Sequence, residues 1–249
     1  MSMLLMGCTS TAATIDGAAV FPTSNLVLRL DASNEGSRDE TTGGEPYLGS
    51  LVGELKYQMI NGAAFAAQGG VAVVSFDGVN DWMGDDTDDS YSAAELLSLN
   101  TGNDFSISAW FYIASLASSV ELWSVHESSS DNFRLHVDSN GAIKLGLNLN
   151  QTAYNSDNGA VAAGGWKIVT LTKTGSATYK TYVNKVEKTL SGGTHTASAN
   201  ANLVIGKTTL APAAYAKAFK LAEFYAYSEA LSEANVEAIF DTTKTKYGL

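Results

Sequence analysis

Cysteine is nearly missing from this sequence, because Cys8 is the only one in 249 residues. A single thiol cannot form a disulfide within the chain, so the sequence does not encode a small secreted scaffold held together by disulfides. The chain has three histidines beside this one cysteine. It therefore also lacks the Cys and His pairs from which structural zinc sites are built.

Basic residues are few, with 15 Lys and Arg against 26 Asp and Glu, which gives a net charge of −11. A nucleic-acid-binding protein neutralises phosphates with a basic stripe, and an anionic membrane attracts basic segments. No such stripe or segment occurs here. We therefore exclude nucleic acid and a membrane surface as partners, whereas the surplus carboxylates remain available to a hard cation.

Long apolar runs are missing too, and none approaches the roughly 20 residues that a transmembrane helix needs. Near the start, Leu5-Met6-Gly7-Cys8 matches the end of a bacterial lipoprotein signal, but no Lys or Arg precedes it. Such a signal requires a basic segment followed by a longer apolar stretch. We therefore expect no lipid anchor and interpret residues 1–24 as an extended apolar arm.

Proline is scarce and glycine abundant, at 3 and 23 residues, while hydrophobic residues make up 45% of the chain and charged residues 16%. This composition is typical of a packed protein made of many short strands joined by tight turns. All-β sandwiches of this length are often one domain. We therefore expect a single domain over residues 25–249.

The centre of the chain has the clearest alternation of apolar and polar residues, which is the pattern of half-buried strands. It runs through residues 105–113, 133–138 and 143–150. Between the last two segments, Ser139-Asn140-Gly141 provides residues that tolerate positive φ, as a two-residue hairpin turn requires. The pattern therefore predicts a hairpin at this point.

Further strands are expected along the rest of the chain, at residues 26–30, 71–76, 166–173, 178–184, 186–190, 203–206 and 219–227. Ser232 can cap a C-terminal helix in which Val236, Ile239 and Phe240 share one stripe. The sequence thus predicts an all-β fold: an antiparallel sandwich of two sheets with one short C-terminal helix.

Five segments, in this order, resemble the laminin-G-like or concanavalin-A-like jelly roll found in phage and other viral structural proteins. They are NLVLRLDASN (25–34), VSFDGVNDW (74–82), DFSISAWF (104–111), GWKIVT (165–170) and KLAEFYAYSEALS (220–232). The Asp-Ala-Ser-Asn opening is similar to that of virion proteins of marine phages. One departure is that residues 35–53 lack the Trp-x-Asp-Leu-Ser-Gly-Asn-Gly segment common in that group.

The resemblance implies a non-enzymatic virion structural protein: a head decoration, head fibre or tail-associated subunit that displays a lectin-like jelly roll. It would be assembled in the host cytoplasm, lie on the virion surface and form a homo-oligomer. Residues 1–24 would bind other virion subunits, and the domain would contact surface glycans. The alternative is a secreted or cell-surface bacterial module that binds glycans outside the cell.

Catalytic motifs do not appear in the sequence. Some concanavalin-A-like jelly rolls are glucanases that carry Glu-x-Asp-x-Glu on a strand, which places paired carboxyl groups on one face. That triplet is absent, and so is a Gly-x-Ser-x-Gly elbow for a serine nucleophile. We therefore expect no enzymatic activity.

The polar positions of the central strands suggest a carbohydrate site, because aromatic rings and amides suit sugar rings and hydroxyl groups. They alternate with the apolar positions, and if their strands share one sheet they would line one face. The predicted residues are Trp110, Tyr112, Arg134, His136, Asn148 and Asn150. In the alternative interpretation, these aromatic side chains pack under loops or a helix.

An acidic loop is the best candidate for a metal site, because Ca²⁺ binds six to eight oxygen ligands. The predicted calcium ligands are Asp81, Asp85, Asp86 and Asp88, with Asp89 nearby. Acidic surface loops are more commonly just solvated, and this spacing does not fit an EF-hand. For Asp77 and Asp81 a structural role is also open, in which they form turns and accept hydrogen bonds from neighbouring amides.

Overall fold

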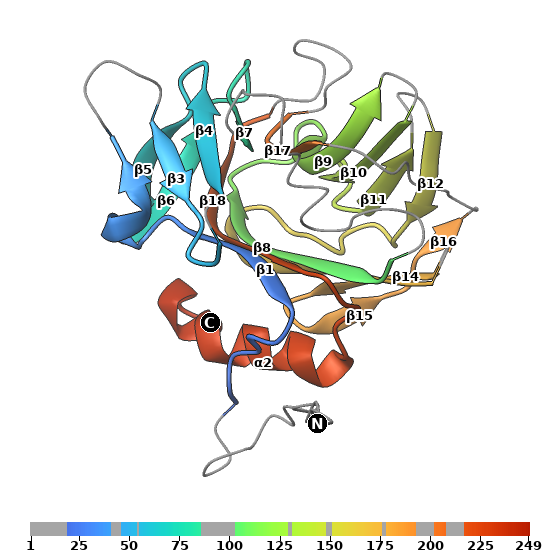
Figure 1. Ribbon diagram of the computed structural model, residues 1–249. Coiled ribbons are helices and arrows are strands. Elements are labelled where there is room, and N and C mark those ends of the chain that lie inside the picture. The colour runs from blue at the N-terminus through green and yellow to red at the C-terminus, as the bar shows by residue number, and fades with distance from the viewer. Residues whose placement is uncertain are drawn as a thin grey trace, which may run out of the picture.

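Two antiparallel sheets and a C-terminal helix make up the described part of the chain (Figure 1). The computed structural model describes residues 19–40, 46–53, 55–85, 103–128, 131–147, 151–175, 178–192, 202–207 and 217–249. The expected fold class, an all-β sandwich with one short C-terminal helix, is confirmed.

Sheet A has the strand order β15-β14-β13-β8-β18-β6-β5, and β1 pairs with the other half of β18. Its described strands are β1 (Leu26–Asp31), β5 (Ala64–Gln68), β6 (Val71–Phe76), β8 (Phe105–Ile113), β13 (Gly165–Thr174), β14 (Thr178–Val183), β15 (Val186–Lys188) and β18 (Phe219–Tyr227).

Sheet B has the order β16-β12-β11-β10-β9-β17-β7-β4-β3-β2. Its described strands are β2 (Arg38–Asp39), β3 (Tyr47–Gly49), β4 (Lys56–Ile60), β7 (Trp82–Asp85), β9 (Val120–Ser128), β10 (Asp131–Val137), β11 (Ile143–Leu147), β12 (Gln151–Asn155), β16 (Ser191–Gly192) and β17 (Asn202–Ile205). A 3₁₀ turn, η1 (Glu35–Ser37), precedes β2.

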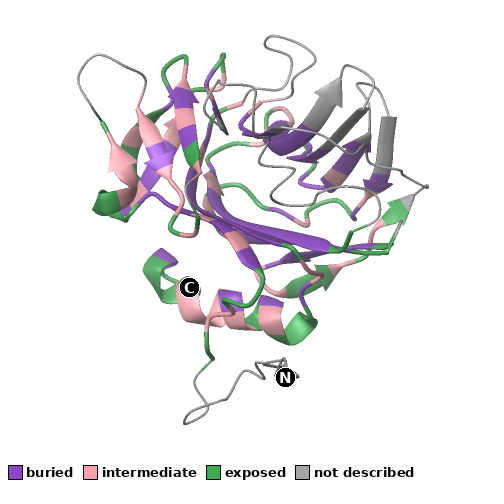
Figure 2. Ribbon diagram, in the orientation of Figure 1, coloured by how far each residue is buried: buried purple, intermediate pink, exposed green. Residues whose placement is uncertain are grey.

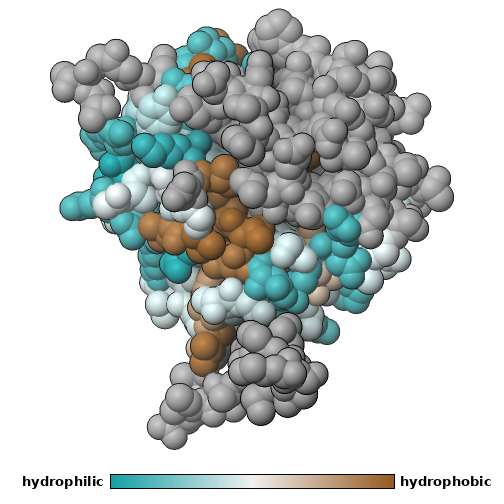
Figure 3. Space-filling model, in the orientation of Figure 1, coloured by the Kyte–Doolittle hydropathy of each residue, from teal (hydrophilic) through white to brown (hydrophobic). Residues whose placement is uncertain are grey.

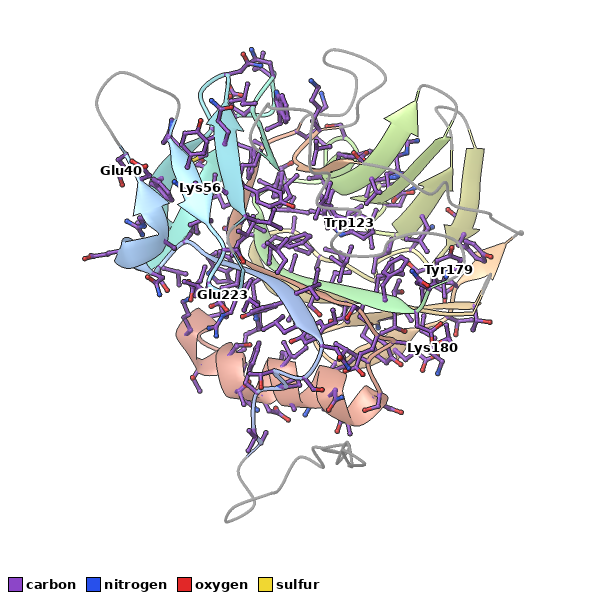
Figure 4. All side chains as sticks on the ribbon, viewed as in Figure 1. Glu40, Lys56, Trp123, Tyr179, Lys180 and Glu223 are labelled. Carbon is purple, nitrogen blue, oxygen red and sulfur yellow. The ribbon has the colours of Figure 1, made fainter. Side chains whose placement is uncertain are left out.

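The main core lies between the two sheets, and Figure 2 shows β8, in the middle of sheet A, as buried along most of its length. The predicted apolar set of β8 points into it, and Phe105, Ile107 and Phe111 are each 1% exposed. From sheet B, Leu135 and Ile143 meet this set with no exposed surface. Figure 4 labels Trp123 between the sheets. The alternation in the sequence therefore identified the core side of the central strands.

A second apolar cluster lies on the other face of sheet A, under the helix α2 (Glu233–Thr243) and the 3₁₀ turn η2 (Lys244–Tyr247). The Ser232 side chain accepts a hydrogen bond from the Asn235 amide, as a helix N-cap does. Val236 and Ile239 are buried, whereas Phe240 is half-buried. The predicted cap and apolar stripe are confirmed, and the helix makes this face of sheet A a buried one.

The predicted hairpin between β10 and β11 exists, with Val137 paired to Ile143. Its loop differs from the two-residue turn that we expected. The Asp138 amide donates to the Ala142 carbonyl, so three residues form the loop, and Gly141 has a φ of +76°. Three-residue loops of this kind place a glycine in the left-handed region after a type I turn.

The domain boundary at residue 25 stays a prediction, but the described chain already packs against sheet A a few residues before it. The ring of Phe21 packs 5.1 Å from that of Tyr225, and Tyr227 Oη donates to the Pro22 carbonyl. Residues 1–18 of the predicted arm lie outside the described residues. Figure 3 shows apolar surface near the middle of this view. Among the described residues, Val20 is 50% and Leu51 37% exposed. The packed part of the protein therefore begins several residues before β1.

Within the described residues, no helix combines the length and the hydropathy that crossing a membrane would require.

Candidate functional site

The face of sheet B that points away from the core carries polar side chains. Leu135, Val137, Ile143 and Leu145 point into the core. Because side chains alternate along a strand, the intervening residues of β10 and β11 point to the opposite face. We define the outer face of sheet B by these residues and their neighbours: Trp82, Glu121, Ser124, Arg134, His136, Lys144, Gly146, Asn155 and Lys207.

The register of the strands places four of these residues in one row. His136 of β10 lies opposite Glu121 of β9 on one side and opposite Lys144 of β11 on the other. Asn155 of β12 lies opposite Lys144. Side chains opposite each other in antiparallel strands are close enough to interact. The outer face of sheet B is therefore a continuous array of hydrogen-bonding groups across four strands.

Glu121 is the most unusual member of this array, because its side chain has no exposed surface. Arg134 Nη1 lies 4.0 Å from Glu121 Oε2, which is an ion pair at the limit of contact. Within the described residues, neither carboxyl oxygen of Glu121 has a hydrogen-bond partner. Burial raises the pKa of Glu121 to about 8, against the opposing effect of Arg134. Glu121 is therefore mostly protonated at neutral pH and can both donate and accept.

His136 is held neutral beside it. Burial lowers the pKa of His136 to about 4, and the nearby charges of Arg134 and Lys144 act in the same direction. Its Nδ1 has no hydrogen-bond partner within the part of the chain that the structure describes. Buried polar atoms in proteins nearly always have a partner, which can be water or a ligand. Glu121 and His136 thus present unused hydrogen-bonding atoms on the same face.

Asp138, at the end of β10, has its carboxylate already engaged. Its Oδ1 accepts from the amides of Asn140 and Ala142 at 2.8 and 3.0 Å, and its Oδ2 lies 3.0 Å from Lys144 Nζ. It stabilises the hairpin loop and positions Lys144, whose side chain is 29% exposed. Lys144 and the half-buried Asn155 are therefore the members of the row that solvent reaches.

Two glycines let large side chains lie flat on the outer face of sheet B. A Cβ atom at Gly146 would lie 2.5 Å from Arg134 Nε, and one at Gly84 would lie 2.6 Å from the Trp82 ring. Lys207 Nζ lies 4.4 Å from the centre of that ring, and the Lys207 carbonyl accepts from Ser124 Oγ. Trp82 and Lys207 thus extend the polar array toward β7.

The raised pKa of Glu121 predicts how stability depends on pH. Between its ordinary pKa of 4.5 and about 8, the folded protein binds a proton that the unfolded chain has lost. The free energy of unfolding must therefore fall as pH rises through that window. The lowered pKa of His136 has the opposite effect below pH 6.5. Urea titrations between pH 6.5 and 8.5 should show the fall in the wild type and not in Glu121→Gln; an equal fall in both would contradict the assignment.

The structure separates the six predicted sugar-binding residues. Arg134 and His136 lie together on the outer face of sheet B, but Trp110 and Tyr112 belong to β8 in sheet A. Trp110 is 0% exposed, stacks 4.0 Å from Tyr247 and donates from Nε1 to Thr243 Oγ1. Tyr112 packs edge-on against Trp166. Trp110 therefore has no surface for a sugar ring, since the helix covers its face of the sheet.

Asn148 and Asn150 lie outside the described residues, and Glu121 was not predicted as a site residue. The sequence offered one signal for Glu121, namely a lone carboxyl group within the apolar segment VELWSV (120–125). Such a group must be neutral, paired or functional when it is buried.

The predicted calcium ligands are only partly described. Asp81 is buried, and its Oδ2 accepts from the Asp77 amide, while Asp77 Oδ1 accepts from the Val79 amide. The turn-forming role of both residues is confirmed. The Asp85 backbone ends β7, and Asp86 and Asp88 lie outside the described residues. Within the described residues, no three His, Cys, Asp or Glu side chains gather as a metal site would require. Calcium binding stays a prediction.

Comparisons with known proteins agree with the two-sheet fold. The fold is similar to that of Trypanosoma rangeli sialidase in complex with sialic acid, with a TM-score of 0.66 and 16% identity over 95% of this chain. It is also similar to the binding domain of botulinum neurotoxin serotype G, with a TM-score of 0.61 and 13% identity over 89% of this chain. This chain spans 36% of the sialidase and 52% of the neurotoxin domain.

At these identities, the likeness to solved structures concerns the fold alone. No curated protein matches the sequence. The family model described as the concanavalin A-like lectin/glucanases superfamily matches residues 85–237, which is more than half of the chain. The chain belongs to the concanavalin A-like lectin/glucanases superfamily.

Proposed function

We propose that this lectin-like jelly roll binds carbohydrate on the outer face of sheet B and has no enzymatic activity. The observation that carries the proposal is the row of Glu121, His136, Lys144 and Asn155, in which buried polar atoms lack partners within the described residues. Sugar hydroxyl groups both donate and accept, as these side chains do. A saccharide that contacts the accessible Lys144 and Asn155 would satisfy the buried atoms of Glu121 and His136 through bridging water.

The absence of catalysis is supported by the neighbours of Glu121. Glycoside hydrolases use two carboxyl groups on either side of the scissile bond. The cross-strand neighbour of Glu121 is His136, and the nearby charge is that of Arg134. Asp138, which follows the strand of His136 directly, is occupied by Lys144 and two backbone amides. Glu121 therefore serves in this proposal as a hydrogen-bonding group.

A glycan array tests the binding proposal. We expect hits for the wild type that disappear in Lys144→Ala and Asn155→Ala, because both side chains are partly exposed and can change without disturbing the core. Lys180→Ala is the matched control, since Lys180 is a partly exposed lysine on sheet A. An array without hits, or hits that survive both changes, would contradict the proposal.

We further propose that the protein is a virion-surface subunit: a head decoration, head fibre or tail-associated protein. The support is the resemblance of the five segments between residues 25 and 232 to viral jelly rolls. The alternative remains a secreted or cell-surface bacterial glycan-binding module. Mass spectrometry of purified phage particles from the source culture decides between them: peptides of this chain should copurify with particles. Peptides found only in the particle-free supernatant would favour the bacterial module.

Calcium binding by Asp81, Asp85, Asp86 and Asp88 is also a proposal. An ion that binds only the folded state raises the melting temperature of the protein. Metal-free protein should therefore melt at a higher temperature after Ca²⁺ is added, and Asp85→Asn with Asp86→Asn should remove the rise. A melt that Ca²⁺ leaves unchanged would exclude the site.

A further inference from the structure

The β5 strand forms one edge of sheet A, at the left of Figure 1. Among the described strands it pairs with β6 only, from Ala64 opposite Ser75 to Gln68 opposite Val71. The hairpin turn is Gly69-Gly70, with φ of +59° and +85°. Because the residues that flank a two-residue turn bond to each other, Gln68, Ala66 and Ala64 bond to β6. The N–H and C=O groups of Phe65 and Ala67 therefore point away from the sheet.

This edge lacks the features that keep strand edges apart. Proteins protect sheet edges with charged residues, proline or bulges. The sequence from Tyr57 to Phe76 contains no charged residue and no proline. By contrast, β15 at the opposite edge of sheet A contains Glu187 and Lys188, and β2 at an edge of sheet B consists of Arg38 and Asp39. Among the described edge strands, β5 is thus uncharged and five residues long, whereas the other uncharged edge, β16 (Ser191–Gly192), has only two residues.

One side chain of β5 packs against the main core, and the exposed side chains of β5 are small. The Phe65 ring packs against the main core, with the Arg38 guanidinium 4.9 Å from its centre. Ala64, Ala66 and Ala67 are exposed. A strand that is anchored on one side and carries only alanine on its exposed positions lets another backbone approach closely.

We propose that β5 joins two copies of this chain in an antiparallel, two-fold symmetric pair, so that the two A sheets become continuous. The pairing places Phe65 opposite Ala67 of the other copy, and Ala66 opposite itself on the axis. Phe65 and Ala67 then exchange both backbone hydrogen bonds at each end, which makes four across the interface. Ala66, in the pair without hydrogen bonds, meets only the methyl group of its counterpart.

A second copy fits this edge because the edge complements itself. Each chain carries a net charge of −11, so two copies repel one another over most of their surfaces. The β5–β6 hairpin contributes no charged residue of its own to the contact, so the copies can approach there with the least repulsion. This dimer depends on neither the glycan site nor residues 1–24.

Sedimentation velocity of the full chain tests the proposal. The wild type should sediment as a dimer at micromolar concentration, and Ala66→Lys should weaken the dimer at least tenfold, because two lysines would face each other on the axis. Val186→Lys is the matched control, since Val186 is 55% exposed on β15. The melting curve of each variant reports whether it folds.

A disulfide test locates the axis. In a Cys8→Ser background, Ala66→Cys should form a covalent dimer on oxidation, because opposite Cβ atoms of such a pair lie within disulfide reach. Val186→Cys in the same background should remain monomeric. A wild-type monomer at every concentration, or a dimer that Ala66→Lys leaves intact and Ala66→Cys does not cross-link, overturns the proposal.

Discussion

Trp110→Ala should lower the free energy of unfolding by about 3–5 kcal/mol, as truncation of a large buried aromatic does. Trp110 lies at the centre of the contact between sheet A and the C-terminal segment. It is completely buried, stacks on Tyr247 and bonds to Thr243. Alanine would leave a cavity between β8 and the helix. Urea unfolding followed by circular dichroism measures the loss.

Trp82→Ala is the matched control, because Trp82 is half-buried on the outer face of sheet B. It should cost clearly less stability than Trp110→Ala and should weaken the response to carbohydrate. The account would be contradicted if Trp110→Ala were as stable as the wild type but had lost binding on the glycan array. That result would show that Trp110 contributes to carbohydrate binding and not to stability.

Glu223→Gln should cost about 1–3 kcal/mol, because Glu223 is buried and charged while its partner Lys246 is 30% exposed, so the ion pair is only partly buried. Glu223 Oε1 accepts from both Lys246 Nζ and Tyr247 Oη, and Lys246 Nζ also donates to Asp31 Oδ1 and Ser33 Oγ. Figure 4 labels Glu223 beside the C-terminal segment. This network ties η2 to β1 and β18, so its loss should loosen the end of the chain first.

The double variant Glu223→Gln with Lys246→Met tests whether the two residues act together. If they do, the loss in the free energy of unfolding of the double variant should be smaller than the sum of the losses of the two single variants. Hydrogen exchange should show faster exchange of the α2 amides in Glu223→Gln. Single losses below about 0.5 kcal/mol, the range of ordinary surface substitutions, would show that the network contributes little.

The fold was predictable where the alternation of apolar and polar residues is regular. Residues 105–113, 133–138 and 143–147 show it, and they form β8, β10 and β11. β9 was missed because of a bulge: Glu121 pairs with His136 and Trp123 with Leu135, so Leu122 is extra. Leu122 and Trp123 are then both in the core, which breaks the period of two. β5 was missed because its alanines show no alternation.

The candidate site was predictable only in part, because alternation tells which side of a strand is polar but not which sheet holds the strand. It identified Arg134 and His136 on the outer face of sheet B. The same logic included Trp110, whose side of sheet A is covered by α2. That cover depends on contacts between β8 and residues more than a hundred positions later, such as Thr243. No local pattern encodes such a contact. Glu121 was not predicted because the bulge beside it breaks the alternation of apolar and polar residues in β9.

The location of a bound saccharide is the most direct test of the central claim. A crystal structure of the protein with its best array ligand should show the sugar on the outer face of sheet B. It should lie within hydrogen-bond distance of Lys144 and Asn155, with water bridging it to the buried Glu121 and His136. A saccharide bound on sheet A, or one held only by loops away from these four residues, would contradict the account.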